Sequence, residues 1–98
     1  MKRRETQNGT AAALALVLSR LDDASVTEDF LVDLCTPAEL EALADRWAVV
    51  PLLAEGVPYR SIHDRTGVSV TTIGRVARCL DHGTGGYRAA LERHTAPA

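Results

Sequence analysis

Residues 59–76 read YRSIHDRTGVSVTTIGRV, and this stretch decides the fold that the sequence predicts. Gly67 suits a turn position with positive φ, and Ser69 suits the N-cap of the helix that follows. Val68, between them, is expected to fill the space between two helices. The apolar residues whose spacing lets two helices pack at a steep angle are Ile62, Ile73 and Val76. The stretch therefore predicts two short helices joined by a tight turn.

The second of these helices, expected over about 70–81, presents polar side chains on its outward face. Hydroxyls near a helix N-terminus donate to phosphate oxygens, arginine pairs with guanine, and a threonine methyl contacts thymine. We therefore interpret residues 58–82 as a helix-turn-helix that reads DNA. The alternative is a plain αα-hairpin with a solvated basic face.

The DNA contacts expected from this motif fall into two groups. We call the second helix of the motif, over about 70–81, the reading helix. Side chains at its start are expected to face base edges, namely Thr71, Thr72 and Arg75. Three arginines are expected mainly to contact phosphates, namely Arg60, Arg65 and Arg78. The full predicted DNA-binding set is Tyr59, Arg60, Arg65, Ser69, Val70, Thr71, Thr72, Arg75 and Arg78.

The remainder of the chain shows helical spacing of its apolar residues and no convincing strand. Thr36, Pro37 and Glu39 form a strong helix start, because they combine a threonine N-cap, a proline at the first helical position and a capping-box glutamate. This helix is expected to end near Gly56. Further helices are expected over about 10–22, after an N-cap at Thr27, over about 58–66 and over about 86–94. The predicted fold class is all-α with six helices.

The length of 98 residues suits one small domain, and 46% of the residues are apolar. Four aromatic residues make a thin core, and small chains with thin cores often complete their packing with a second subunit. We therefore expect a flexible basic arm over 1–9, a single helical domain over 10–98 and a homodimer. The composition excludes a disordered chain and a membrane span, and the expected location is the cytoplasm.

The net charge of −2 conceals a strong polarisation along the chain. Residues 22–55 carry nine acidic residues against Arg46 alone, whereas residues 56–82 carry four arginines against two aspartates. The second segment includes the motif predicted to meet DNA, so the local balance favours a nucleic-acid partner. The acidic segment supports a rival class, a helical dimeric protein-interaction module that no longer reads DNA. The basic residues of 1–9 either lie along DNA or form a plain basic tail.

The residue patterns that would indicate an enzyme or a metal site are missing from the sequence. His63, His82 and His94 lie far apart, without cysteine or aspartate at ligand spacing. There is no Ser/His/Asp or Cys/His set, and no glycine-rich phosphate loop follows a strand. Cys35 and Cys79 are interpreted as buried small residues. We predict a non-enzymatic protein without a metal.

Four further segments bear on the family: LCTPAELEALADRW (34–47), LLAEG (52–56), GGYR (85–88) and ALER (90–93). Together with the helix-turn-helix they resemble the tryptophan-repressor superfamily, most closely its TrpR-related YerC/YecD branch. The resemblance implies an intertwined homodimer whose central helices cross and whose two reading heads project outward. Such heads contact successive major grooves about 34 Å apart and favour a palindromic site. The implied function is sequence-specific regulation of transcription, as a repressor.

In the amino-acid-sensing repressors of this superfamily, an effector pocket lies between the central helix and the reading helix. The resemblance places this pocket at Thr36, Arg46, Arg75, Val76 and Cys79. Arg46 and Arg75 would sandwich a flat ring or pair with a carboxylate. Val76 stands where the tryptophan-binding members have a glycine that leaves room for the ligand, and Cys79 replaces a hydroxyl. L-Tryptophan is therefore not the expected ligand, which leaves another small-molecule co-repressor or none.

Overall fold

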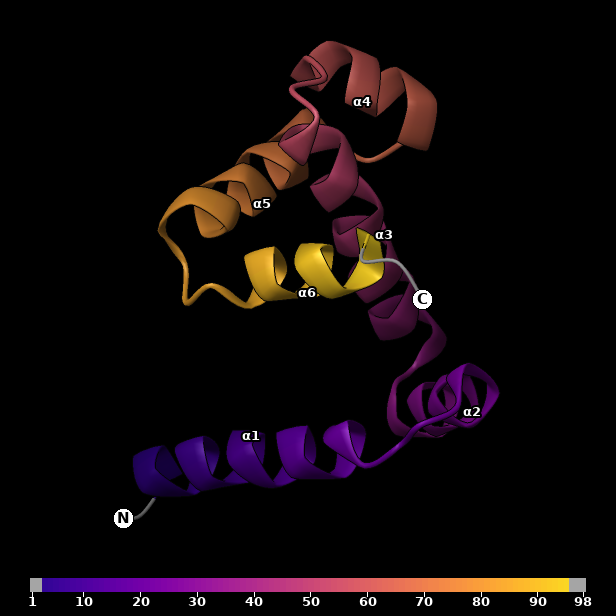
Figure 1. Cartoon of the computed structure of the whole chain (residues 1–98), viewed down its shortest axis with the longest axis vertical. Helices are drawn as coiled ribbons and strands as arrows, with labels where there is room; N and C mark the ends of the chain where they lie inside the picture. The colour runs from indigo at the N-terminus through magenta and orange to yellow at the C-terminus, as the bar shows by residue number, and fades with distance from the viewer. Residues whose placement is uncertain (1–2, 96–98) are drawn as a thin grey trace. The chain divides into compact units, whose positions relative to one another are not determined.

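A computed structural model describes the backbone of residues 3–95 and the side chains of residues 9–94. Over this range the chain forms six α-helices and no strand. Figure 1 shows where each helix lies along the chain. They are α1 (Arg3–Ser19), α2 (Ala24–Leu34), α3 (Pro37–Ala54), α4 (Tyr59–Thr66), α5 (Val70–His82) and α6 (Gly86–Thr95). The predicted all-α class with six helices is confirmed.

The chain divides into two compact units, with the boundary after Leu40 near the start of α3. The first unit holds α1, α2 and the first residues of α3. The second unit, from Glu41 onward, holds the rest of α3 together with α4, α5 and α6. The two units differ in how they pack, so each is described separately.

The first helix differs from its predicted bounds at both ends. α1 is helical from Arg3, whereas the sequence predicted a flexible arm over 1–9 and a helix over about 10–22. The early start has a local reason, because arginine, glutamate and glutamine near the N-terminus are good helix formers. The helix ends at Ser19, whose Oγ donates to the Leu16 carbonyl at 2.7 Å. Met1 and Lys2, also part of the predicted arm, lie outside the described residues.

The second helix begins earlier than its predicted cap. Asp23, and not Thr27, is the N-cap of α2, since its Oδ1 accepts hydrogen bonds from the amides of Ser25 at 2.7 Å and Val26 at 3.4 Å. Thr27 lies inside the helix and donates from its hydroxyl to the Asp23 carbonyl at 3.0 Å. Aspartate and threonine are both residue types that cap helices, and Asp23 and Thr27 lie only four positions apart. Asp23 directly precedes Ala24, the first residue of α2, so its carboxylate is the group placed to bond the first free amides of the helix.

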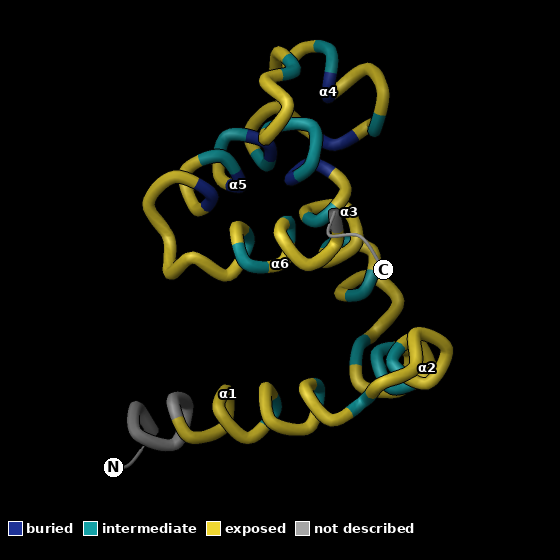
Figure 2. The backbone as a smooth tube through the Cα atoms, viewed as in Figure 1, coloured by how far each residue is buried: buried dark blue, intermediate teal, exposed yellow. Residues whose placement is uncertain are grey.

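Burial is low throughout the first unit. Between residues 9 and 40 every side chain is half-buried or exposed, and none is buried, as Figure 2 shows. Its exposed large apolar side chains include Val32, which is 56% exposed. The others are Leu16, Val17, Val26 and Leu34. In the single chain, α1 and α2 therefore leave these apolar side chains exposed to water.

The third helix begins and ends as the sequence predicted. The Thr36 amide donates to Glu39 Oε1 at 2.8 Å, and the Glu39 amide donates to Thr36 Oγ1 at 3.1 Å, which completes the capping box. At the other end Gly56 has a φ of 83° and donates to the Leu53 carbonyl, while the Val57 amide donates to the Leu52 carbonyl. This pair of bonds is a Schellman motif, so the capping box and the glycine fix both ends of α3.

Among the residues whose side chains are described, the buried core lies in the second unit. It consists of Val49, Val50, Ile62, Val68, Ile73, Val76 and Leu80, from α3, α4, the following turn and α5. The half-buried residues packed against it are Trp47, Leu52, Leu53, Val57, Tyr87 and Leu91. In Figure 2 the buried segments accordingly appear only on α3, α4, α5 and the turn between α4 and α5. This core fixes α4 and α5 against the C-terminal half of α3.

Candidate nucleic-acid interface

The turn between α4 and α5 has the geometry that the sequence predicted. Gly67 has a φ of 79°, a left-handed conformation that side chains with a Cβ rarely adopt, and its amide donates to the His63 carbonyl at 2.8 Å. Val68 is buried between the two helices, as expected of a plug residue. α4, a three-residue turn and α5 therefore have the order and turn length that a helix-turn-helix requires.

Two side chains at the end of α4 hold the backbone of this turn. The Thr66 hydroxyl donates to the Ile62 carbonyl at 2.7 Å and accepts from the Val68 amide at 3.1 Å. His63 Nδ1 lies 2.7 Å from the Val68 carbonyl oxygen. Because a carbonyl oxygen only accepts, Nδ1 carries the hydrogen. Both polar backbone groups of Val68 are thus bonded, which fixes the angle at which α5 leaves the turn.

Sequence reasoning missed this role of His63 and Thr66. His63 was considered as a metal ligand, and Thr66 was not singled out. The signal that could have found the bonds is a hydroxyl and a ring nitrogen in the last turn of a helix that ends at a glycine. Such groups often bond the backbone of the turn.

The first turn of α5 is capped by Ser69, as predicted. Ser69 Oγ accepts from the Thr72 amide at 3.1 Å and donates to the Thr72 hydroxyl at 3.0 Å. Thr72 is half-buried and takes part in this cap, which corrects the expectation that it faces outward like Thr71. Its position on the helix, between the outward face and the core, explains the difference.

The outward face of α5 is opposite the buried side of the helix. Ile73, Val76 and Leu80 point into the core, so the residues about half a turn away point outward. Thr71, Arg75 and Arg78 are all exposed, and Val70 is 50% exposed. On α4 and the turn, the exposed members of the predicted set are Tyr59, Arg60, Arg65 and Ser69.

This face is basic, and none of its arginines forms a salt bridge with another described residue. α4 and α5 carry Arg60, Arg65, Arg75 and Arg78 against Asp64 and Asp81. Asp81 Oδ1 lies 3.4 Å from Arg88 Nη2 of α6, so part of the negative charge near the end of α5 is already paired. An array of exposed arginines and hydroxyls around a helix N-terminus is suited to phosphate oxygens.

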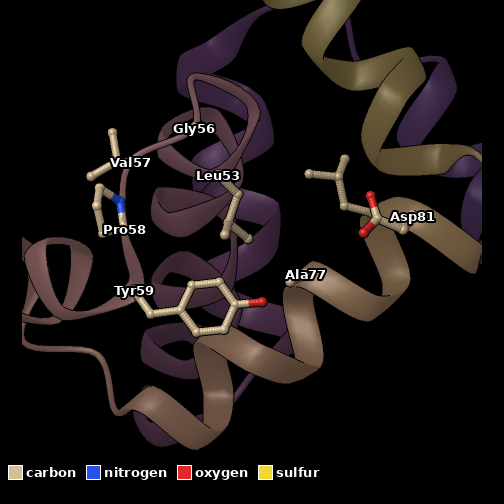
Figure 3. Close-up of a pocket in the computed structure, with 8 residues that line it drawn as sticks. Leu53, Gly56, Val57, Pro58, Tyr59, Ala77 and Asp81 are labelled. Atoms are coloured by element: carbon tan, nitrogen blue, oxygen red, sulfur yellow. The ribbon is translucent and has the colours of Figure 1, made fainter.

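A cavity of about 350 Å³ is lined by residues from the end of α3, the connection to α4, the start of α4 and α5. Figure 3 shows Tyr59 reaching from the start of α4 with its hydroxyl toward Ala77, and Asp81 further along α5. The other lining residues are Leu53, Gly56, Val57, Pro58 and Leu80. A second cavity, of about 430 Å³, is lined by Cys79, Gly83, Thr84, Gly86 and Tyr87.

The five residues that the resemblance assigns to an effector pocket have different surroundings. Val76 is 3% exposed and belongs to the core. Cys79 is exposed and lines the second cavity, which corrects the prediction that it is buried; it lies on the flank of α5 and not on the core side. Arg46 and Arg75 are exposed and line neither of the two cavities. Thr36 belongs to the first unit.

Trp47, on α3 beside Arg46, is half-buried and packs against the core. Its ring meets that of His94 on α6 edge to face, with centroids 5.9 Å apart and an interplanar angle of 89°. This contact ties the last helix to α3. Cys35 is half-buried, and both cysteines are free thiols.

Two kinds of feature are absent from the described residues. None of the described helices combines the length and apolar character needed to cross a membrane. Likewise, the described part of the chain has no group of three or more histidine, cysteine, aspartate or glutamate side chains placed to hold a metal ion.

Comparison with known proteins identifies the family. The sequence profile described as Trp repressor protein matches residues 10–95. The chain belongs to the Trp repressor family. It is 47% identical over 64 residues to the uncharacterized protein YerC of Bacillus subtilis strain 168. That alignment covers 65% of this chain and 62% of YerC, so the chain spans less than two thirds of this relative's length.

Two solved structures share the whole fold of this Trp repressor family member. One is a crystal structure from Staphylococcus aureus whose Trp repressor assignment is provisional, with a TM-score of 0.84 and 28% identity over 100% of this chain and 98% of that one. The other is a TrpR-like protein from Eubacterium eligens ATCC 27750, with a TM-score of 0.78 and 34% identity over 93% of each chain. The predicted TrpR-like fold and YerC relationship are therefore confirmed.

Proposed function

We propose that this chain is a sequence-specific DNA-binding regulator of transcription that acts as a repressor by occupying a palindromic operator as a homodimer. The observation that carries the proposal is the α4–α5 pair. A hydrogen-bonded turn fixes α5, whose exposed face presents Thr71, Arg75 and Arg78. Membership of the Trp repressor family supports the same function.

The first unit supports the homodimer. An isolated pair of helices with no buried residue between positions 9 and 40 lacks the burial that stabilises small domains. A second copy would cover the exposed apolar side chains of α1 and α2. Two copies related by a two-fold axis carry two α5 helices, and two reading helices bind two half-sites one helical turn of DNA apart.

Selection of bound duplexes from a random pool, with and without amino acids, tests the proposed function. The chain should enrich a palindrome, and its affinity should fall steeply with salt because phosphate contacts release counterions. The protein-interaction module suggested by the acidic residues 22–55 predicts the opposite, with no enriched sequence and no steep salt dependence.

Substitutions divide the proposed contacts into two kinds. Arg75→Ala or Thr71→Ala should cost about 1–3 kcal/mol of binding free energy and relax base preference at one step. Arg60→Ala should weaken selected and random duplexes alike, because a phosphate contact carries no sequence information. Equal losses on both duplexes for all three variants would contradict this division.

We propose further that L-tryptophan is not the effector of this regulator. The burial of Val76 supports this, because its side chain fills core space at the position where the tryptophan-binding members have a glycine. Calorimetric titration with L-tryptophan should give no binding heat. If a Val76→Gly variant binds L-tryptophan, the Val76 side chain is what prevents binding in the wild type.

A further inference from the structure

Gly74 lies in the middle of α5, where glycine is a poor choice. It is the fifth of the thirteen residues of the helix. The glycines of this chain with positive φ in the described residues are Gly56, Gly67 and Gly85, so the backbone conformation of Gly74 does not require glycine. Glycine in a helix interior loses more conformational entropy on folding than alanine does. The residue is therefore destabilising for α5 unless it has another use.

Packing within the chain does not explain Gly74 either. A Cβ built there meets no atom within 4 Å beyond its own helical turns. Gly83 is different, because a Cβ there would collide with the Cys79 carbonyl group. A glycine that the chain itself does not need, on a helix face, indicates that something outside the chain approaches the backbone closely.

The surroundings of Gly74 indicate what approaches. Its neighbours on the helix surface, three and four residues away, are Val70, Thr71, Ala77 and Arg78. We call the half-buried surface of α5 at Gly74, where a side chain is lacking and these four residues are the neighbours, the Gly74 notch. Its N-terminal side offers the methyl groups of Val70, which is 50% exposed, and of Thr71. The backbone at Gly74 offers no free hydrogen-bonding group, because backbone groups in a helix interior bond one another.

A small apolar surface suits a small apolar group. On the major-groove edges of the four base pairs, that group is the 5-methyl of thymine. We propose that the Gly74 notch seats a thymine 5-methyl group and so specifies thymine at one step of each half-site. This inference rests on the proposed function and adds to it a specificity determinant that contributes no side chain of its own.

The experiment exchanges one methyl group for another. Wild type and Gly74→Ala are titrated at fixed salt with the selected duplex and with duplexes carrying single thymine-to-uracil changes, which remove only the methyl group. One change in a single half-site should weaken binding by the wild type about fourfold, the effect of one buried methyl group, and the same change in both half-sites should weaken it about fifteenfold. Gly74→Ala should bind the thymine duplex at least about tenfold more weakly than wild type does. It should bind the matching uracil duplex better than the thymine duplex, because the alanine methyl occupies the vacated space.

Two controls separate this effect from damage to the fold. Gly86→Ala, at the start of α6, makes the same change where the nearest atom to the new Cβ is Thr84 Oγ1 at 3.9 Å, and it should bind both duplexes as the wild type does. The melting temperature of Gly74→Ala should rise by a few degrees, because alanine stabilises a helix interior.

Each outcome decides between the two proposals. A wild type that binds no duplex selectively overturns the proposed function, and this inference with it. If the wild type binds selectively but loses no affinity at any thymine-to-uracil change, the thymine contact alone is overturned. The same holds if Gly74→Ala loses affinity for the thymine and uracil duplexes equally.

Discussion

The two units of the chain are built from similar helices but bury very different amounts of apolar surface. In the second unit seven apolar residues form a buried core, and a hydrogen-bonded turn fixes α5 against it. In the first unit, residues 9–40 contain several exposed valines and leucines and no buried residue. The second unit is thus packed by its own residues. The first leaves apolar side chains exposed, which is why we infer that a second copy covers them.

The largest effect on stability is expected for a substitution in the buried core of the second unit. Ile73→Ala should lower the free energy of unfolding by about 2–5 kcal/mol, because it removes buried methyl groups and leaves a cavity. Val70→Ala, three residues earlier and half-exposed, should change it by less than about 0.5 kcal/mol. Urea denaturation followed by circular dichroism measures both. Equal losses for the two variants would contradict the assignment of the core.

The next prediction concerns the first unit. Leu16→Asp should raise the dissociation constant of the homodimer at least about 100-fold, which is about 2.7 kcal/mol, because it places a charge in an apolar contact. Thr10→Asp introduces the same charge on the same helix at a polar position and should leave association nearly unchanged. Sedimentation velocity over a range of concentrations measures this, and identical dissociation constants for the two variants would break the comparison.

The turn between α4 and α5 gives a smaller effect. His63→Ala should cost about 1–2 kcal/mol of unfolding free energy, because the Val68 carbonyl loses its donor. DNA affinity should fall as well, since α5 is then held less firmly. Asp64→Ala, at the next position of α4 and also exposed, is the control for both measurements. A His63→Ala variant that matches this control in stability would show that the bond does not hold the turn.

The smallest expected effect is at the boundary between the units. Thr36→Ala should lower stability by about 1 kcal/mol, since α3 loses its capping hydroxyl, and Thr36→Ser should restore most of the loss. Thermal denaturation monitored at 222 nm resolves a difference of this size. Failure of serine to restore stability would contradict a capping role.

Some features of this fold could be predicted from the sequence because they depend on nearby residues alone. The residues that bond or shape the backbone only a few positions away could be recognised from the order of residues alone. They are Thr36, Glu39, Gly67 and Ser69. The cap of α2 was assigned to Thr27 and belongs to Asp23, because two good capping residues lie only four positions apart. Helix starts are uncertain for this reason.

The candidate site follows the same division. The outward positions of Thr71, Arg75 and Arg78 follow from helical periodicity alone. The surroundings of Cys79 and of the other residues that the resemblance assigns to an effector pocket depend on how separate helices pack, and spacing along the chain does not predict this packing. Gly74 could have been noticed as a helix-interior glycine, but its open surroundings become apparent only in three dimensions.

The mass of the complex with the selected duplex tests the central inference most directly. Native mass spectrometry should show two chains on one duplex, with no stable complex of one chain, because the exposed first unit pairs two copies before either α5 is fixed on DNA. Leu16→Asp should remove this species. A complex of one chain per duplex with full selectivity would contradict the account.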